Sequence, residues 1–184
     1  GDLLAKLWLV MDISALAVVT AGITGRFADD IGRAIIDEIT IEWGNVIYDR
    51  LRPEFMHLWE EVSILQENHL GSVTGKLKTD EALTKAAGRS QRLYVPLEFW
   101  FQREYGAAVP IISLHLTDAK VSVRLKAKAN LIVAGTGYTV LTTDAVLSNM
   151  FLLGEFIYLD DPERSARRGC NPSDRANERP RDRA

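Results

Sequence analysis

Cysteine is nearly absent from this 184-residue chain. The single residue, Cys170, cannot form a disulfide bond within the chain. The fold must therefore be held by apolar packing and hydrogen bonds, which fits a reducing compartment or a fold that does not depend on disulfides. Hydrophobic residues make up 47% of the sequence, so the chain is long and apolar enough for one domain with a substantial core.

Long apolar runs are also absent. The closest approach, residues 3–23, is interrupted by Lys6, Asp12, Ser14 and Thr20, and no run reaches the roughly 18 residues that a membrane span needs. A signal peptide is not expected, because the chain starts with Gly1-Asp2 rather than with Met and a basic region. The missing initiator Met indicates a fragment or a processed product.

Histidine is scarce, and its spacing does not predict a metal site. His57, His69 and His115 are far apart in the sequence, and none belongs to an H-x-H or H-x-x-x-H pattern. We interpret His57 as a helix surface residue and His115 as a hydrogen-bonded sheet residue. We expect no metal and no cofactor.

The motifs of common enzymes are missing or incomplete. Gly71–Lys76 is one residue short of a phosphate-binding loop, and Leu77 stands where the metal-binding hydroxyl would be. No Gly-x-Ser-x-Gly motif is present. Three adjacent carboxylate pairs occur, and we interpret them as solvated charges because neighbouring side chains point apart: Asp29/Asp30, Glu60/Glu61 and Asp160/Asp161. We therefore expect a protein that is not an enzyme.

The charge balance argues against a nucleic-acid-binding protein. The net charge is −3, so the chain has no general attraction for phosphates. One predicted strand, residues 119–129, carries Arg124, Lys126 and Lys128 on one face, which could contact phosphate. A solvated sheet face or a subunit contact is the favoured interpretation.

Hydrophobic periodicity predicts a mainly β protein. Residues 3–13 alternate as a strand, with a helix as the competing prediction, and residues 36–50 predict two strands joined by a turn at Gly44-Asn45. Residues 53–65 predict a helix, with Pro53 at its first position. Its apolar stripe has three- and four-residue spacing and consists of Phe55, Leu58, Trp59 and Val62. A short helix near residues 80–87 is expected within a long loop, residues 66–91.

The most aromatic stretch of the chain is residues 92–115. It predicts two strands, residues 92–102 and 109–116, joined by a charged turn that contains glycine. Pro96 lacks a backbone donor, so we expect the first strand at a sheet edge or with a bulge. The aromatic side chains are expected to form the inner wall of a β-sandwich.

These elements predict a jelly-roll β-sandwich with one or two short helices in a long loop. We expect residues 1–160 to form this domain. Residues 161–184 contain no large apolar side chain and are rich in both arginine and acidic residues, so we expect a charged, disordered tail.

The aromatic stretch also carries a resemblance to a known family. The sequences LYVPLEFWF at residues 93–101 and GAAVPIISLH at residues 106–115 resemble paired strands of the major capsid proteins of nucleocytoplasmic large DNA viruses, the iridovirus, phycodnavirus and mimivirus group. Further stretches match in the family's order: residues 1–4, 31–44, 46–49, 54–60, 156–160 and 163–164. The residues that mark the family here, each expected to be structural, are Trp43, Trp59, Tyr94, Pro96, Phe99, Trp100, Phe101, Pro110, Tyr158 and Asp160.

The resemblance is incomplete in three respects. The family's proteins are double jelly rolls, and this chain supplies most of the first roll, without its first strand before Gly1 and without a second roll after Arg168. Residues 170–184 match nothing in the family's pattern. Trp43-Gly44-Asn45 replaces a Gly-Gly pair of that pattern.

The resemblance implies a structural capsid protein of the virion. It implies homotrimers with pseudo-hexameric outlines that pack against neighbouring capsomers and minor capsid proteins in an icosahedral shell assembled in the host cytoplasm. It implies no small-molecule substrate and no direct nucleic-acid readout.

Two other classes stay open at this point. A jelly-roll carbohydrate-binding or cupin-like domain would need a histidine cluster or an exposed aromatic platform that includes Trp100, and burial of Phe99 and Trp100 would exclude the platform. A nucleic-acid-binding protein would need Arg124, Lys126 and Lys128 to join a larger basic surface.

Overall fold

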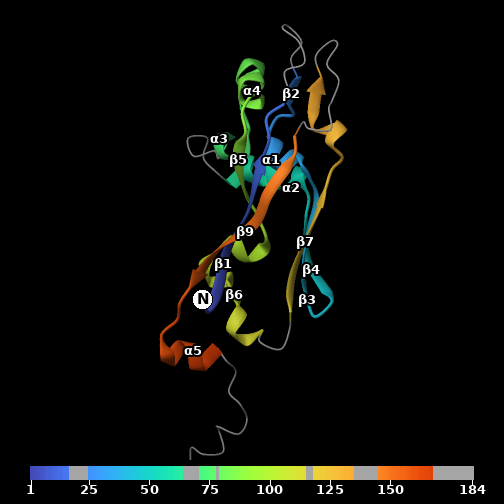
Figure 1. The fold of residues 1–184 in the computed structure, drawn as a ribbon. Helices are drawn as coiled ribbons and strands as arrows, with labels where there is room; N and C mark the ends of the chain where they lie inside the picture. Colours follow the sequence, from blue (N-terminus) through green and yellow to red (C-terminus); the bar gives the residue numbers. More distant parts are fainter. Residues whose placement is uncertain (17–24, 64–70, 78, 115–117, 135–144, 168–184) are drawn as a thin grey trace, which may run out of the picture.

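The first sheet is built around the strand β1 (Leu3–Ile13). The computed structural model describes residues 1–16, 25–63, 71–77, 79–114, 118–134 and 145–167, and Figure 1 shows their arrangement. Along one side, β1 pairs antiparallel with β5 (Gln91–Pro96) and β6 (Val109–Pro110), and along the other with β9 (Leu147–Ile157). The predicted strand at residues 3–13 is therefore confirmed, and the strands beside it in the sheet come from residues 91–157, distant in the sequence.

The second sheet contains the predicted hairpin. Its central strand, β3 (Ile36–Trp43), lies between β4 (Val46–Leu51) and β7 (Ala119–Leu125), and both pairings are antiparallel. Gly44 and Asn45 have φ angles of 56° and 63°, the left-handed pair that a two-residue turn between twisted strands requires. A short third sheet joins β2 (Gly25–Phe27) to β8 (Ile132–Ala134).

The core lies between the inner faces of the two larger sheets. Most residues of β1 are buried, and residues alternate between buried and partly buried from Ile39 to Trp43 of β3. The large buried side chains of this core include Leu9, Met11, Ile39 and Ile41, together with Phe27, Phe99 and Phe101. The predicted fold class, a mainly β jelly-roll sandwich, is confirmed.

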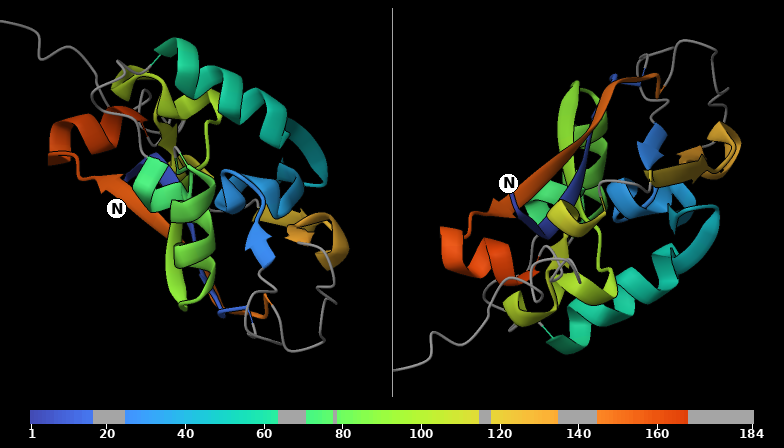
Figure 2. Two further views of the ribbon diagram at one scale, coloured as in Figure 1. Left: turned by 90° about the horizontal axis from the view of Figure 1, so that it is seen from above. Right: turned by 90° about the horizontal axis from the view of Figure 1, so that it is seen from below.

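Short helices occupy the connections and the ends of the molecule. They are α1 (Ile31–Ala34), α2 (Pro53–Ser63), α3 (Gly71–Thr74), α4 (Asp80–Ala87) and α5 (Asp161–Arg167). The predicted helix near residues 80–87 is confirmed: the Thr79 hydroxyl caps it by accepting from the backbone N–H of Ala82. In Figure 1, α4 and α5 lie at opposite ends of the molecule. Figure 2 shows the molecule from above and from below, and α2 lies at the periphery in both views.

The aromatic stretch is less extended than its sequence predicts. β5 ends at Pro96, and Trp100–Gln102 form a 3₁₀ turn, so the predicted strand over residues 92–102 is wrong in its second half. β6 has only two residues and is followed by the 3₁₀ turn Ile111–Ser113. Each of these strands ends at a proline, which has no N–H to donate to a neighbouring strand. The edge position expected from Pro96 is correct.

The tail also differs from expectation near its start. Asp161–Arg167 form α5 where the composition predicts disorder. Asp2 explains why, because its carboxylate accepts hydrogen bonds from the Arg164 side chain at 2.8 Å and from the Leu159 backbone N–H at 2.9 Å. The disorder predicted for residues 168–184 lies outside the described part of the chain.

Candidate assembly surfaces

An aromatic groove opens where the two sheets meet near the β3–β4 turn. It has a volume of about 170 Å³ and is lined by Trp43, Tyr48, Trp100, Val109, Pro110 and Leu114. Trp43 is buried and contacts Tyr48 edge-on, with 4.9 Å between ring centroids, whereas Tyr48 and Trp100 are 59% and 42% exposed. The structure thus brings together three of the predicted residues, Trp43, Trp100 and Pro110, on one apolar surface.

The 3₁₀ turn after β5 sets the orientation of this groove. Leu97 donates from its backbone N–H to the Leu7 carbonyl, which holds the chain against β1 after Pro96. Phe99 and Phe101 are then both buried and stack at 5.7 Å, while Trp100 between them points outward and meets Phe101 edge-on. Trp100 is therefore not buried as expected, and burial does not exclude the aromatic-platform alternative. The structural role of Phe99 and Trp100 stays a prediction.

The remaining predicted residues are dispersed. Tyr94 is partly buried and Pro96 fully buried on β5, and Tyr158 is 75% exposed just after β9. Asp160 is exposed, and its carbonyl accepts from the backbone N–H of Arg164 in α5. Tyr158 and Asp160 lie between β9 and α5, at the same end of the molecule as the groove, because Pro110 and Ile157 are both register partners of Leu3 (Figure 1).

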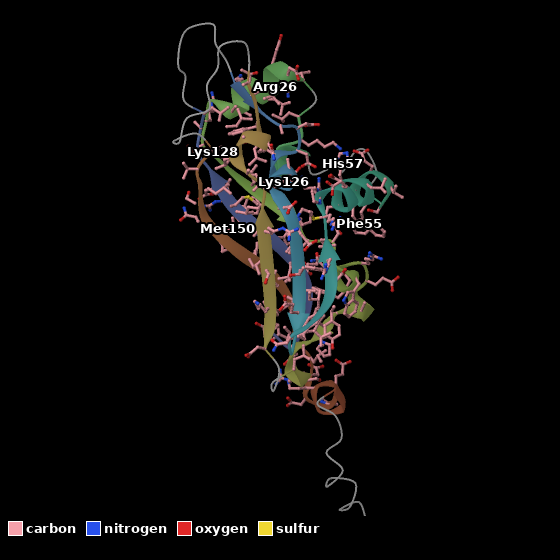
Figure 3. The ribbon with its side chains drawn as sticks, turned by 90° about the vertical axis from the view of Figure 1, so that its right-hand side faces the viewer. Arg26, Phe55, His57, Lys126, Lys128 and Met150 are labelled. Atoms are coloured by element: carbon pink, nitrogen blue, oxygen red, sulfur yellow. The ribbon has the colours of Figure 1, made fainter. Side chains whose placement is uncertain are left out.

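The helix α2 turns its predicted apolar stripe away from the core. Phe55, Leu58 and Val62 are 39%, 61% and 77% exposed. Pro53, Met56 and Glu60 are buried instead. Trp59 stacks on Phe55, and the Arg103 guanidinium lies 4.5 Å from the Trp59 ring centroid. Figure 3 labels Phe55 and His57 on this helix, which lies at the edge of the molecule in that view. The predicted stripe is therefore a second apolar surface on the outside of the molecule.

A buried ion-pair network explains this orientation of α2. The Arg33 Nη1 atom donates to Asp30 Oδ2 at 2.8 Å and to Glu60 Oε2 at 2.5 Å, and all three side chains are buried. Burial alone would lower the pKa of Arg33, but the charges of Asp30 and Glu60 outweigh it and raise that pKa. Burial raises the pKa of nearby Glu98, the Arg33 charge opposes this, and the Glu60 charge adds to it.

Sequence reasoning missed this network. Asp30 and Glu60 belong to adjacent carboxylate pairs interpreted as solvated, which is wrong for these two residues. Their sequence neighbours Asp29 and Glu61 are exposed, so the two members of each pair do point apart. The available signal was the four-residue spacing of Met56 and Glu60, which places both on one face of the helix.

The basic face of β7 is matched by acidic residues of its own neighbours. Arg124 pairs with Asp37 at 2.5 Å, Lys120 with Glu42 at 3.6 Å, and Lys126 with Glu54 at 3.9 Å. Figure 3 shows Lys126 and Lys128 toward one end of this sheet. The larger basic surface that a nucleic-acid-binding protein would need is thus broken up by β3 and α2 carboxylates.

Possible metal ligands are dispersed over the described residues. Within them, no three His, Cys, Asp or Glu side chains are grouped closely enough to hold a metal ion. His57 lies half-exposed beside Asp30, with 3.5 Å between its Nδ1 and Asp30 Oδ2. His69 and His115 fall outside this part of the chain.

None of the helices in the described ranges is long and apolar enough to cross a membrane.

Two facing antiparallel sheets, a short β3–β4 turn and long loops that carry helices define the class of jelly-roll β-sandwich proteins. Comparison with known sequences identifies the family: its profile, described as "Major capsid protein N-terminus", matches residues 1–160. The chain belongs to this family.

Individual relatives agree with this assignment. The major capsid protein of Pyramimonas orientalis virus is 26% identical over 167 residues, which cover 89% of this chain and 39% of that protein. "Probable capsid protein 4" of Acanthamoeba polyphaga mimivirus is 26% identical over 133 residues, which cover 68% of this chain and 26% of that protein. The chain therefore spans well under half the length of these relatives.

Solved structures share the fold. The crystal structure of PBCV-1 VP54, fitted into a cryo-electron-microscopy reconstruction of the virophage Sputnik, superposes with a TM-score of 0.71 at 20% identity, covering 91% of this chain and 38% of that one. A quasi-atomic model of the PBCV-1 virus capsid gives a TM-score of 0.70 at 19% identity, with the same coverage. These likenesses confirm the jelly-roll architecture.

Proposed function

We propose that this chain is the first jelly-roll domain, residues 1–160, of a structural capsid protein and acts as a building block of a viral shell. The observation that carries the proposal is the family match over those residues, together with a sandwich that superposes on capsid structures. The relatives are named as capsid proteins of large DNA viruses. Its work is packing and surface complementarity, without catalysis.

The exposed apolar surfaces support such a role. Large exposed apolar patches on a soluble protein mark interaction sites, and this molecule has the aromatic groove, the α2 stripe and the strand β9. A stable subunit contact buries upwards of roughly 1,000 Å² in total, which calls for surfaces of this kind. The family resemblance leads us to propose that the partners are two further copies in a trimer of pseudo-hexameric outline, then neighbouring capsomers and minor capsid proteins. It likewise suggests assembly in the host cytoplasm and residence in the virion.

Purified particles from cells that produce this chain test the proposal. Quantitative mass spectrometry should find the polypeptide among the most abundant particle proteins, and capsomers released by mild dissociation should have three times the subunit mass. Recovery of the chain only outside particles would overturn the capsid role. Abundant capsomers of another stoichiometry would overturn the trimer alone.

The carbohydrate-binding alternative rests on one observation, the exposed ring of Trp100 beside Tyr48. Binding to immobilised glycans that is lost in Trp100→Ala, while the thermal unfolding midpoint is unchanged, would favour it over a packing role for this groove.

A further inference from the structure

Glu98 is a partly buried carboxyl group in a fixed stretch of backbone between β5 and the 3₁₀ turn Trp100–Gln102. Its neighbours Leu97 and Phe99 are fully buried. The Leu97 N–H donates to the Leu7 carbonyl, and the Phe99 N–H donates to the Leu97 carbonyl. Within the described residues, the Glu98 side chain has neither a hydrogen bond nor a salt bridge. The carboxyl group is thus held in a poorly solvating place without a direct partner.

The charges that act on Glu98 come from three elements. Arg33 of α1 and Arg103, just after the 3₁₀ turn, favour its ionised form, whereas Glu60 of α2 opposes it. The helix α3 also packs on α1 and β5, and its residues Gly71–Thr74 carry no titratable side chain. Glu98 therefore lies among two positive charges and one negative charge from its surroundings.

The nearby guanidinium of Arg33 is already committed to other carboxylates. Its Nη1 atom donates to Asp30 Oδ2 and to Glu60 Oε2. His57 of α2 faces the same Asp30 oxygen at 3.5 Å. The Arg33 Nε and Nη2 atoms are buried without a hydrogen-bond partner, so Glu98 does not reach them in this arrangement. Ionised Glu98 would be a third carboxylate beside one buried guanidinium.

Burial makes ionisation of Glu98 unfavourable while this cluster is closed. It raises the pKa of Glu98 above the ordinary value, the Arg33 charge lowers that pKa, and the Glu60 charge raises it. A carboxyl group with a raised pKa stabilises the closed arrangement while it is protonated. This contribution is complete below the ordinary glutamate pKa of about 4.3 and is lost as the pH rises through the raised value.

The helix α2 is the element that ionisation of Glu98 would displace. Along its length the buried residues are Pro53, Met56 and Glu60, and the apolar stripe faces outward. Outside the Arg33 network, the Arg103 guanidinium lies 4.5 Å from the Trp59 ring centroid. The helix is therefore held by few side chains, and one of them, Glu60, repels the ionised form of Glu98.

We infer that Glu98 is a proton-dependent switch for the position of α2: the neutral carboxyl keeps α2 packed on α1, and the ionised carboxylate favours an arrangement in which α2 has moved away. Movement of α2 hydrates Glu98 and removes the Glu60 charge. Arg33 stays paired with Asp30, and its Nε and Nη2 atoms become available to Glu98. Since α2 carries the exposed apolar stripe, proton uptake fixes that surface in place. The inference does not depend on the capsid role.

Hydrogen exchange of the original chain at low micromolar concentration tests the inference first. The protection of α2 amides, corrected for the intrinsic exchange rate at each pH, should fall several-fold between pH 4.5 and pH 8. A pKa difference of one between the two arrangements changes their ratio up to tenfold. The protection of β1 amides should change less than twofold. Equal protection of α2 at both pH values, or an equal fall in α2 and β1, would overturn the inference.

Three variants identify the titrating group. Glu98→Gln has the shape of the neutral carboxyl, so at both pH values its α2 protection should equal that of the original chain at pH 4.5. His57→Gln removes a side chain of a type that ordinarily changes charge in this pH range, and it should leave the fall intact. Glu104→Gln, at an exposed carboxylate, is the matched control and should also leave it intact. A fall that persists in Glu98→Gln, or that disappears in His57→Gln or Glu104→Gln, would overturn the inference.

Discussion

Arg33 lies between two carboxylates in the interior, and this position makes the stability of the fold sensitive to its replacement. It has 1% of its side chain exposed, and Glu60 has none. A buried ion pair adds little net stability when it is intact, but removing one partner strands the other charge in a poorly solvating environment.

Arg33→Met should therefore lower the free energy of unfolding by about 3–5 kcal/mol, measured by urea denaturation. The double variant Arg33→Met with Glu60→Met should recover part of this loss, because the carboxylate no longer lies buried without the guanidinium. A double variant whose loss in the free energy of unfolding exceeds the sum of the losses of the two single variants would contradict this account.

The ionisation of Asp12 makes the stability of the folded chain depend on pH. Arg92 and Asn149 hydrogen-bond to its carboxylate and lower its pKa to about 2 from an ordinary 3.8. Because the pKa is lower in the folded chain, ionisation of Asp12 favours folding. This contribution is complete above about pH 4 and is lost as the pH falls toward 2.

Asp12→Asn should thus lower the urea midpoint at pH 7, and the difference from the original chain should shrink at pH 2.5. Asp161→Asn is the control, because the Asp161 side chain is 96% exposed and its ion pair with Arg164 is long, at 3.8 Å. A difference for Asp12→Asn that stays constant across the pH range would show that the carboxylate charge does not contribute.

At the scale of the element, α2 confirms the predicted helix over Pro53–Ser63, and its buried face is the one opposite the predicted apolar stripe. Met56→Ala should cost about 2–5 kcal/mol, because Met56 is fully buried. Leu58→Ser and Val62→Ser should change stability by no more than about 0.5 kcal/mol, because both residues face solvent. Chemical denaturation of the three variants compares the two faces of α2. A large loss of unfolding free energy in Val62→Ser would show that the apolar stripe packs against the core.

The limits of prediction from sequence are clearest in neighbouring elements. The β3–β4 turn was predictable because Gly44 and Asn45 are local determinants of a two-residue turn. The orientation of α2 depends on Arg33, which is 27 residues away in the sequence, and periodicity alone does not report such a partner. The groove at Trp100 likewise depends on where β5 ends. The aromatic composition of residues 92–102 does not predict that position.

For the whole molecule, exposed apolar surface should dominate behaviour in solution. Phe151 and Leu153 on β9 and Leu58 on α2 are each more than 40% exposed. The isolated 184-residue chain should therefore aggregate in size-exclusion chromatography with light scattering. Leu153→Lys, which places a charge on the edge strand β9, should keep the chain soluble to a several-fold higher concentration. A monodisperse monomer of the unmodified chain would contradict this prediction.

The position of β1 has a consequence for how fast the chain folds. β1 precedes the other described strands in the sequence, yet its partner β9 begins at Leu147, more than a hundred residues later. At about 5–20 residues per second, β1 waits roughly 7–30 s on the ribosome before β9 is made. Pairings so distant in sequence close slowly, because the intervening loop loses entropy before any contact compensates it. β1 can pair with β5 earlier, but its edge toward β9 stays open until β9 is made, so we expect nascent chains to need protection by chaperones during this interval.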